Sequence, residues 1–208
     1  MRKARLLAMF LVAALVAGPF GKLVAGAEEP PATSEAPKAG SPRAVVLTFF
    51  QSFADGNAQA LRDAVLADSD DERKVVDGMA EVAGAVAGAR KAVVTKFNVR
   101  DRDLNIQIVP VGVFSAMTER IENDTASLVQ DGQVIIVLKK VSGAWKVALG
   151  ELLKQGGKTT DRTMSDLKGS IERVGQVAKD VESGKFTSAD LAAKAISEAV
   201  PSRDDASQ

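Results

Sequence analysis

The sequence predicts an α+β protein in which three N-terminal helices pack on a curved antiparallel sheet and a helical extension follows at the C-terminus. Apolar residues recur at helical spacing between residues 42 and 97. The period changes to strand-like alternation after Phe114, and helical spacing returns after Gly157. This order, helices first and then an unbroken set of strands, is what predicts the class.

Residues 1–27 have the pattern of a cleavable secretory signal. Three basic residues precede twelve apolar ones at 6–17, and small side chains at 25–27 suit cleavage after Ala27. A membrane span needs about 20 apolar residues, so we expect no stable membrane anchor after cleavage; a retained anchor is the alternative. The sequence therefore predicts export to the periplasm, the cell envelope or the exterior.

The composition of the mature chain excludes several classes of function. Four of the 27 basic residues lie in the signal, so 23 basic residues face 27 acidic ones. This negative balance argues against a nucleic-acid partner, which needs a positive surface. The absence of histidine and cysteine excludes serine and cysteine triads and imidazole or thiolate metal ligands. We therefore expect no metal site and no cofactor.

The first two helices follow a linker, residues 28–40, whose three prolines and polar residues indicate disorder. Ser41 caps the first helix, with Pro42 in its first turn, and Gly56 ends it. Asn57 caps a short second helix. The apolar faces of these helices carry Val46, Phe49, Phe50, Phe53, Leu61 and Val65.

The third helix is long. Ser69 and Glu72 form a capping box at its start, and Asn98 ends it. Residues 99–112 are ambiguous between a loop and a short strand that Pro110 would end. The apolar face of the helix carries Val75, Met79, Val82, Val86, Val93 and Phe97.

Four strands are expected next, over residues 116–122, 125–129, 133–141 and 144–149. The dipeptides between them are Asn-Asp, Asp-Gly and Ser-Gly, which are typical of hairpin turns. The strands therefore form a consecutive antiparallel meander. The third strand is apolar on both faces, so both faces of the sheet should be covered.

A helical hairpin is expected over residues 156–201, before a disordered tail at 202–208. Its first helix begins at Thr163 and carries one apolar stripe. Since the N-terminal helices can cover only the concave face of the sheet, we expect the stripe to cover the outer face. A homodimer through residues 163–181 is the second choice. The stripe consists of Met164, Leu167, Ile171, Val174 and Val181.

Two segments of the unit at residues 41–155 are similar to parts of a known fold. Residues 46–57 look like the first helix and stop, and residues 140–147 like the last hairpin, of the nuclear transport factor 2-like superfamily. The resemblance covers about residues 42–150 and implies a cystatin-like roll, a fold that hosts isomerases, cyclases, dehydratases and pure binding domains. The family's isomerases use an aspartate base with tyrosine in the pocket, and this chain has no tyrosine.

Arg90 and Glu119 are the charged residues predicted to point inward. Arg90 falls in the middle of the apolar stripe of the third helix, and Glu119 shares a strand face with Met117 and Ile121. We predict an inward ion pair between them, which would be structural. An unpaired Glu119 in an apolar cone would instead be a weak candidate for a general base, and an unpaired Arg90 could bind an anionic ligand.

Aromatic residues of the helices and the last strand can meet near these charges. They would form either a ligand pocket between the helices and the sheet or an ordinary core. The candidate pocket residues are Phe49, Phe53, Arg90, Phe97, Met117, Glu119 and Trp145.

The function that this sequence predicts is an exported binding or interaction module without catalytic apparatus, with room for a small apolar or anionic molecule. The alternative is a small-molecule enzyme of the same fold, of isomerase, cyclase or hydrolase type, with a carboxylate base. The second alternative is a structural oligomer.

Overall fold

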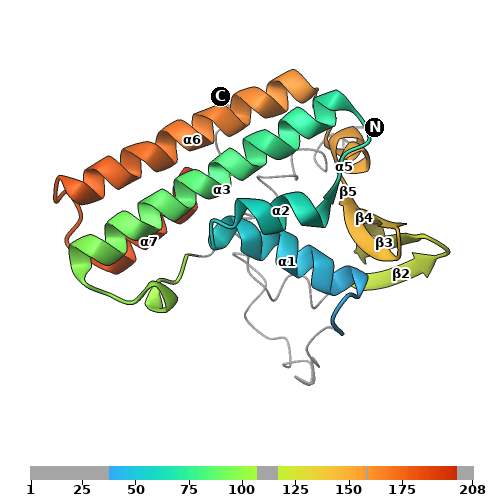
Figure 1. The fold of residues 1–208 in the computed structure, drawn as a ribbon, viewed down its shortest axis with the longest axis horizontal. Coiled ribbons are helices and arrows are strands. Elements are labelled where there is room, and N and C mark those ends of the chain that lie inside the picture. Colours follow the sequence, from blue (N-terminus) through green and yellow to red (C-terminus); the bar gives the residue numbers. More distant parts are fainter. Residues whose placement is uncertain (1–37, 107–116, 158, 201–208) are drawn as a thin grey trace.

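The computed structural model describes residues 38–106, 117–157 and 159–200 (Figure 1). The predicted signal, most of the linker and the C-terminal tail lie outside these residues. The described part contains six α-helices and a five-stranded mixed sheet. The expected α+β class is therefore correct.

The N-terminal helices begin where the sequence predicts, but Val65, which was expected on the second helix, follows it in an extended conformation. They are α1 (Pro42–Ala54), α2 (Ala58–Ala64) and α3 (Asp70–Phe97). The caps Ser41, Asn57 and Ser69 each accept a hydrogen bond from a backbone N–H three residues later. Asn98 ends α3 in the left-handed conformation, with φ 52°. These local signals decide the three boundaries because each satisfies or terminates a helix end.

The sheet contains the predicted meander and one further strand. Its strands are β1 (Val65–Leu66), β2 (Thr118–Glu122), β3 (Thr125–Gln130), β4 (Gln133–Val141) and β5 (Ala144–Ala148), in the order β1-β5-β4-β3-β2. The meander β2–β5 is antiparallel, whereas β1 pairs with β5 in parallel. The strand β1 could not be predicted from the sequence, because two residues are too few to show the alternation of apolar and polar residues that marks a strand.

Two hairpins of the meander have the turn geometry that their dipeptides predict. Asp131 and Gly132 have φ 51° and 77°, and Ser142 and Gly143 have φ 51° and 84°. Two successive residues with positive φ are the mark of type I′ turns, whose twist matches that of the flanking strands. The Ser142-Gly143 turn fixes the register of β4 and β5, whereas the Asp131-Gly132 turn fixes that of β3 and β4 only as far as an irregularity between Leu128 and Val129.

The C-terminal helices depart from expectation in two ways, because the first of them was not predicted and the second begins earlier than expected. They are α5 (Leu149–Gly156), α6 (Thr160–Glu182) and α7 (Ala189–Ala199). The helix α5 begins where the last strand was expected to end. The helix α6 begins before Thr163, because Thr159 is its cap; Thr163 lies inside, and its hydroxyl donates to the Thr159 carbonyl.

The ambiguous segment after α3 is only partly described. It contains a 3₁₀ turn at Asp101–Asp103, labelled η4 in the element order. The strand considered began at Ile106, which is buried and lies in no strand, and its remaining residues fall outside the described part of the chain.

The prediction that α6 covers the outer face of the sheet is wrong. Figure 1 shows α6 lying along α3, and the two helices run parallel. Near their starts, a Cβ on Gly78 would lie 3.1 Å from both Leu167 Cδ1 and Met164 Cε. Near their ends, Lys96 Nζ donates to the Glu182 carbonyl at 3.3 Å.

The reason for this packing is the width of the buried face of α3. Its buried positions run from Gly78 and Ala89 on one side to Val76 and Ala80 on the other, which at 3.6 residues per turn covers about 200° of the circumference. A face of that width needs helices on more than one side. The apolar stripe of α6 is consequently buried inside the molecule, since Leu167, Val174 and Val181 are all buried.

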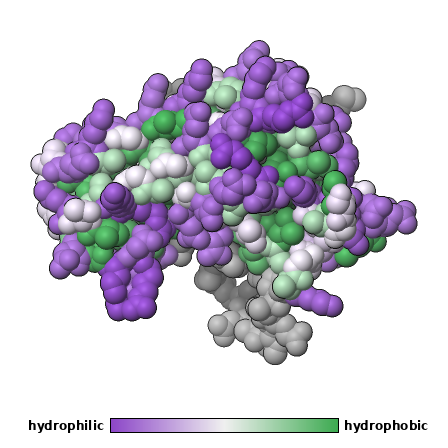
Figure 2. All heavy atoms as spheres, in the orientation of Figure 1, coloured by the Kyte–Doolittle hydropathy of each residue, from purple (hydrophilic) through white to green (hydrophobic). Residues whose placement is uncertain are grey.

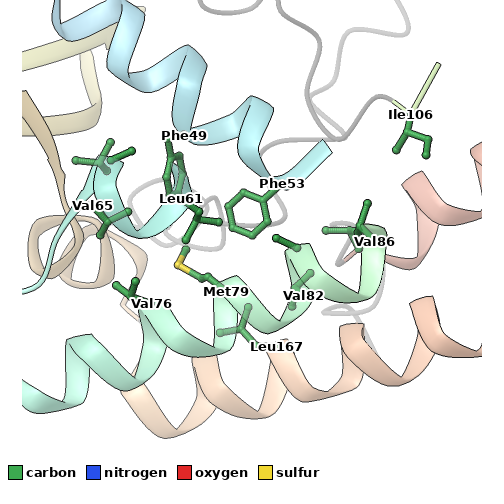
Figure 3. Packing of buried hydrophobic residues seen from close by; sticks show 14 of the residues in the cluster. Phe49, Phe53, Leu61, Val65, Val76, Met79, Val82, Val86, Ile106 and Leu167 are labelled. Carbon is green, nitrogen blue, oxygen red and sulfur yellow. The ribbon is translucent and has the colours of Figure 1, made fainter. Parts of the chain in front are cut away.

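One hydrophobic core joins the N-terminal and C-terminal helices (Figure 3). Phe49 and Phe53 of α1 point toward Met79 of α3, and Leu167 of α6 meets α3 from its other side. The same cluster continues into the sheet through Leu128 and Leu138 and into α7 through Ile196. Residues 160–200 thus contribute to the same core as the N-terminal helices.

Candidate functional site

Arg90 is buried, as predicted, but its partner is not Glu119. Its guanidinium forms a fork with Asp101, with Nε to Oδ1 at 3.0 Å and Nη2 to Oδ2 at 2.9 Å. The third nitrogen, Nη1, donates to the Ala54 carbonyl at 2.6 Å. Arg90 therefore ties α3 to η4 and to the last residue of α1, where helix carbonyls lack partners within the helix.

Glu119 is held at the opposite end of α1. Its Oε2 accepts a hydrogen bond from the backbone N–H of Arg43 at 3.2 Å. The Arg43 guanidinium donates in turn to the Met117 carbonyl at 2.6 Å, while its buried Nε has no hydrogen-bond partner. A carboxylate at a helix N-terminus is favoured by the helix dipole, so Glu119 joins β2 to the start of α1.

The length of α1 keeps the two predicted charges apart. The helix has 13 residues, which at 1.5 Å per residue makes it roughly 20 Å long. Arg90 binds its C-terminal end, and Glu119 binds its N-terminal end. The predicted ion pair between Arg90 and Glu119 is therefore wrong, although the register pairs Glu119 with Leu128 on the core side of the sheet as expected.

The predicted aromatic residues divide between the core and the surface. Phe49 and Phe53 are 2% and 4% exposed, and their rings meet edge to face with centroids 5.5 Å apart. Phe97 and Trp145 are half-buried. Lys140 Nζ lies 5.7 Å from the Trp145 ring centroid, a cation–π contact at the surface of the sheet. Phe49 and Phe53 are thus accounted for by core packing.

Sequence analysis missed Arg43 and Asp101, the groups that engage the predicted site residues. Asp101 follows Arg90 by eleven positions, and the left-handed residue Asn98 between them turns the chain back. A periodicity argument cannot find this contact, because it crosses a helix end. Arg43 lies in the first turn of α1, where its backbone N–H has no acceptor within the helix and needs an outside acceptor.

The groups with shifted pKa values lie on the surfaces of the helices and make no contact with Arg90 or Glu119. A hydrogen bond from Arg73 lowers the pKa of Asp70, and one from Lys185 lowers the pKa of Asp180. A hydrogen bond to Asp71 raises the pKa of Lys74. All three are ordinary ion pairs near helix ends, and they identify no catalytic acid or base.

The described parts of the chain contain neither a metal-binding cluster nor a membrane-spanning helix. No group of three or more acidic side chains there is placed to hold a metal ion. No helix within residues 38–106, 117–157 or 159–200 is long and apolar enough to cross a membrane.

The chain matches no known family, no curated protein and no solved structure. The resemblance of residues 42–150 to the nuclear transport factor 2-like superfamily therefore stays a prediction.

Proposed function

We propose that the mature protein is an exported, non-catalytic interaction module that binds its partner through the meander. The support comes from where its exposed apolar side chains lie. Among the described residues, four large apolar side chains are exposed, and three of them are on the sheet: Ile121 at 53%, Val134 at 38% and Val141 at 39%. The register places Val134 beside the Asp131 turn at the other end of the sheet, so Ile121 and Val141 carry the proposal. Exposed apolar side chains at one end of a sheet are a feature of interaction sites.

The roles of Arg90 and Glu119 favour this function over an enzyme. Arg90 is engaged by Asp101 and by the end of α1, and Glu119 by the start of α1. Both are thus used to hold the fold. The rival enzyme would need Glu119 free to face a substrate, so we do not propose it.

The binding surface that we propose is the end of the sheet that carries the turns at Asn123 and Ser142. Ile121 and Val141 flank these turns on β2 and β4. The register places Ile121 on the face of Leu138 and Val141 on the other face, so a partner would contact both sides of this end of the sheet. Trp145 lies on β5 opposite Lys140 in the register. The order of three helices before a meander supports the further proposal that residues 41–155 form a cystatin-like roll, with this end open to a partner.

Site-specific photo-crosslinking in the native host tests the proposal. A photoreactive residue at Ile121 or Val141 is expected to give a discrete adduct with another protein. Leu191 on α7 is the matched control, since it is apolar and 51% exposed, and it should give none. Ile121→Lys should remove the Val141 adduct while leaving the thermal midpoint unchanged. Absence of adducts from the sheet, or equal adducts from Leu191, contradicts the proposal.

A further inference from the structure

The solvent-facing side of α3 carries two charged residues that have no ion-pair partner among the described residues. Five charged residues in its first half have ion-pair partners within the chain: Asp70, Asp71, Arg73, Lys74 and Asp77. Glu81 and Lys91 are exposed, and neither forms an ion pair or side-chain hydrogen bond with another described residue. They are ten positions apart, about 15 Å along the axis at 1.5 Å per residue, so they cannot pair with each other.

These two charges flank two exposed glycines at mirrored spacing. Glu81 lies three residues before Gly84, and Lys91 lies three residues after Gly88. All four residues are exposed, and the spacings of three, four and three place them on one side of the helix. Figure 2 shows white and pale green spheres over the middle of α3, with purple side chains around them.

No described residue requires glycine at these two positions. A Cβ on Gly84 or Gly88 would meet no atom within 4 Å, whereas one on Gly78 would meet α6 at 3.1 Å. Glycine in a helix interior is less favourable than alanine. The two glycines therefore weaken α3, and packing among the described residues gives no reason for them. Because they have no side chains, the backbone of another helix can approach α3 closely at these positions.

We propose that α3 associates with α3 of a second copy of this chain, antiparallel, about a two-fold axis between Gly84 and Gly88. Antiparallel pairing about that point places Gly84 opposite Gly88 of the second copy. It also places Glu81 opposite Lys91 of the second copy, and Lys91 opposite its Glu81. The surface is thus self-complementary in charge, as a two-fold interface must be.

This inference is independent of the proposed function, which concerns the sheet. It also differs from a dimer through the α6 stripe, because that stripe is buried against α3 and α7. A monomeric protein would overturn the inference and leave the binding proposal for Ile121 and Val141 intact.

Charge reversal tests the interface, with sedimentation equilibrium of the purified mature protein as the readout. Glu81→Lys and Lys91→Glu each put like charges opposite one another, so each should raise the dimer dissociation constant by at least about tenfold. The double variant Glu81→Lys with Lys91→Glu restores opposite charges at both contacts and should recover the affinity. An equimolar mixture of the two single variants should form heterodimers for the same reason.

Glycine substitution separates the interface from the fold. Gly84→Ala and Gly88→Ala should raise the thermal midpoint of the monomer, because the added methyl groups meet nothing in the chain. Gly88→Leu should leave the circular dichroism spectrum unchanged and abolish the dimer. The proposal is overturned if the protein is monomeric at every concentration up to the millimolar range. The proposal is also overturned if the protein forms a dimer whose dissociation constant is unchanged by all of these substitutions.

Discussion

Deletion of residues 160–208 is expected to abolish cooperative folding. The deletion removes α6 and α7, whose apolar side chains belong to the same core cluster as those of α1 and α3. Without α6 and α7, the side of α3 that carries Gly78 becomes exposed to solvent. A large exposed apolar surface leads to aggregation. The truncated protein should show no sharp thermal transition and should bind hydrophobic dyes. A soluble truncated monomer that unfolds at the midpoint of the full chain would show that the C-terminal helices are dispensable.

Two leucine substitutions give the same test in a protein that still folds. Leu167 on α6 is 1% exposed, and Leu191 on α7 is 51% exposed. Leu167→Ala should lower the free energy of unfolding by about 3 kcal/mol, because it leaves a cavity between α3 and α6. Leu191→Ala should change it by less than about 1 kcal/mol. Equal effects in urea denaturation would mean that α6 does not pack on α3.

Gly56→Ala is expected to have the largest effect of any substitution of one small residue by another. Gly56 lies in the α1–α2 turn with φ 69°. An added Cβ would lie 2.4 Å from Ala87 Cβ and 2.9 Å from the Ala83 carbonyl oxygen. Because both belong to α3 and neither can rotate away, the turn must move off the helix. The free energy of unfolding should fall by about 3 kcal/mol or more, the sum of left-handed strain and overpacking.

Gly132→Ala is the control for the backbone conformation alone. Gly132 has φ 77°, and a Cβ there would meet nothing within 4 Å. Its substitution should therefore lower the free energy of unfolding by only about 1–2 kcal/mol, the cost of the left-handed conformation. If the two variants unfold at the same urea concentration, the close approach of Gly56 to α3 contributes nothing.

Local chemistry accounts for what the sequence could predict. Ser41, Asn57 and Ser69 cap their helices, and the Asp-Gly and Ser-Gly turns pair the strand residues next to them. Each of these signals acts over two to four residues, and its structural effect depends little on the rest of the fold. The buried faces of α1 and α3 follow from periodicity for the same reason.

Contacts between distant elements account for what the sequence could not predict. The stripe of α6 is visible in the sequence, but the choice between the sheet and α3 depends on how wide the buried face of α3 is. The same holds for Arg90. Its burial could be predicted from the apolar stripe of α3, but its partner Asp101 depends on the path of the chain after Asn98. Each of these partners is decided by tertiary arrangement, about which apolar period carries no information.

Arg90 and Glu119 hold opposite ends of α1 and do not form a site together. Double-mutant cycles with Arg90→Met, Asp101→Ala and Glu119→Ala, read from urea denaturation, test this arrangement most directly. We expect a coupling energy of about 1 kcal/mol or more between Arg90 and Asp101. Between Arg90 and Glu119 we expect the effects to add within about 0.5 kcal/mol. A strong coupling of Arg90 to Glu119, with none to Asp101, would contradict this arrangement.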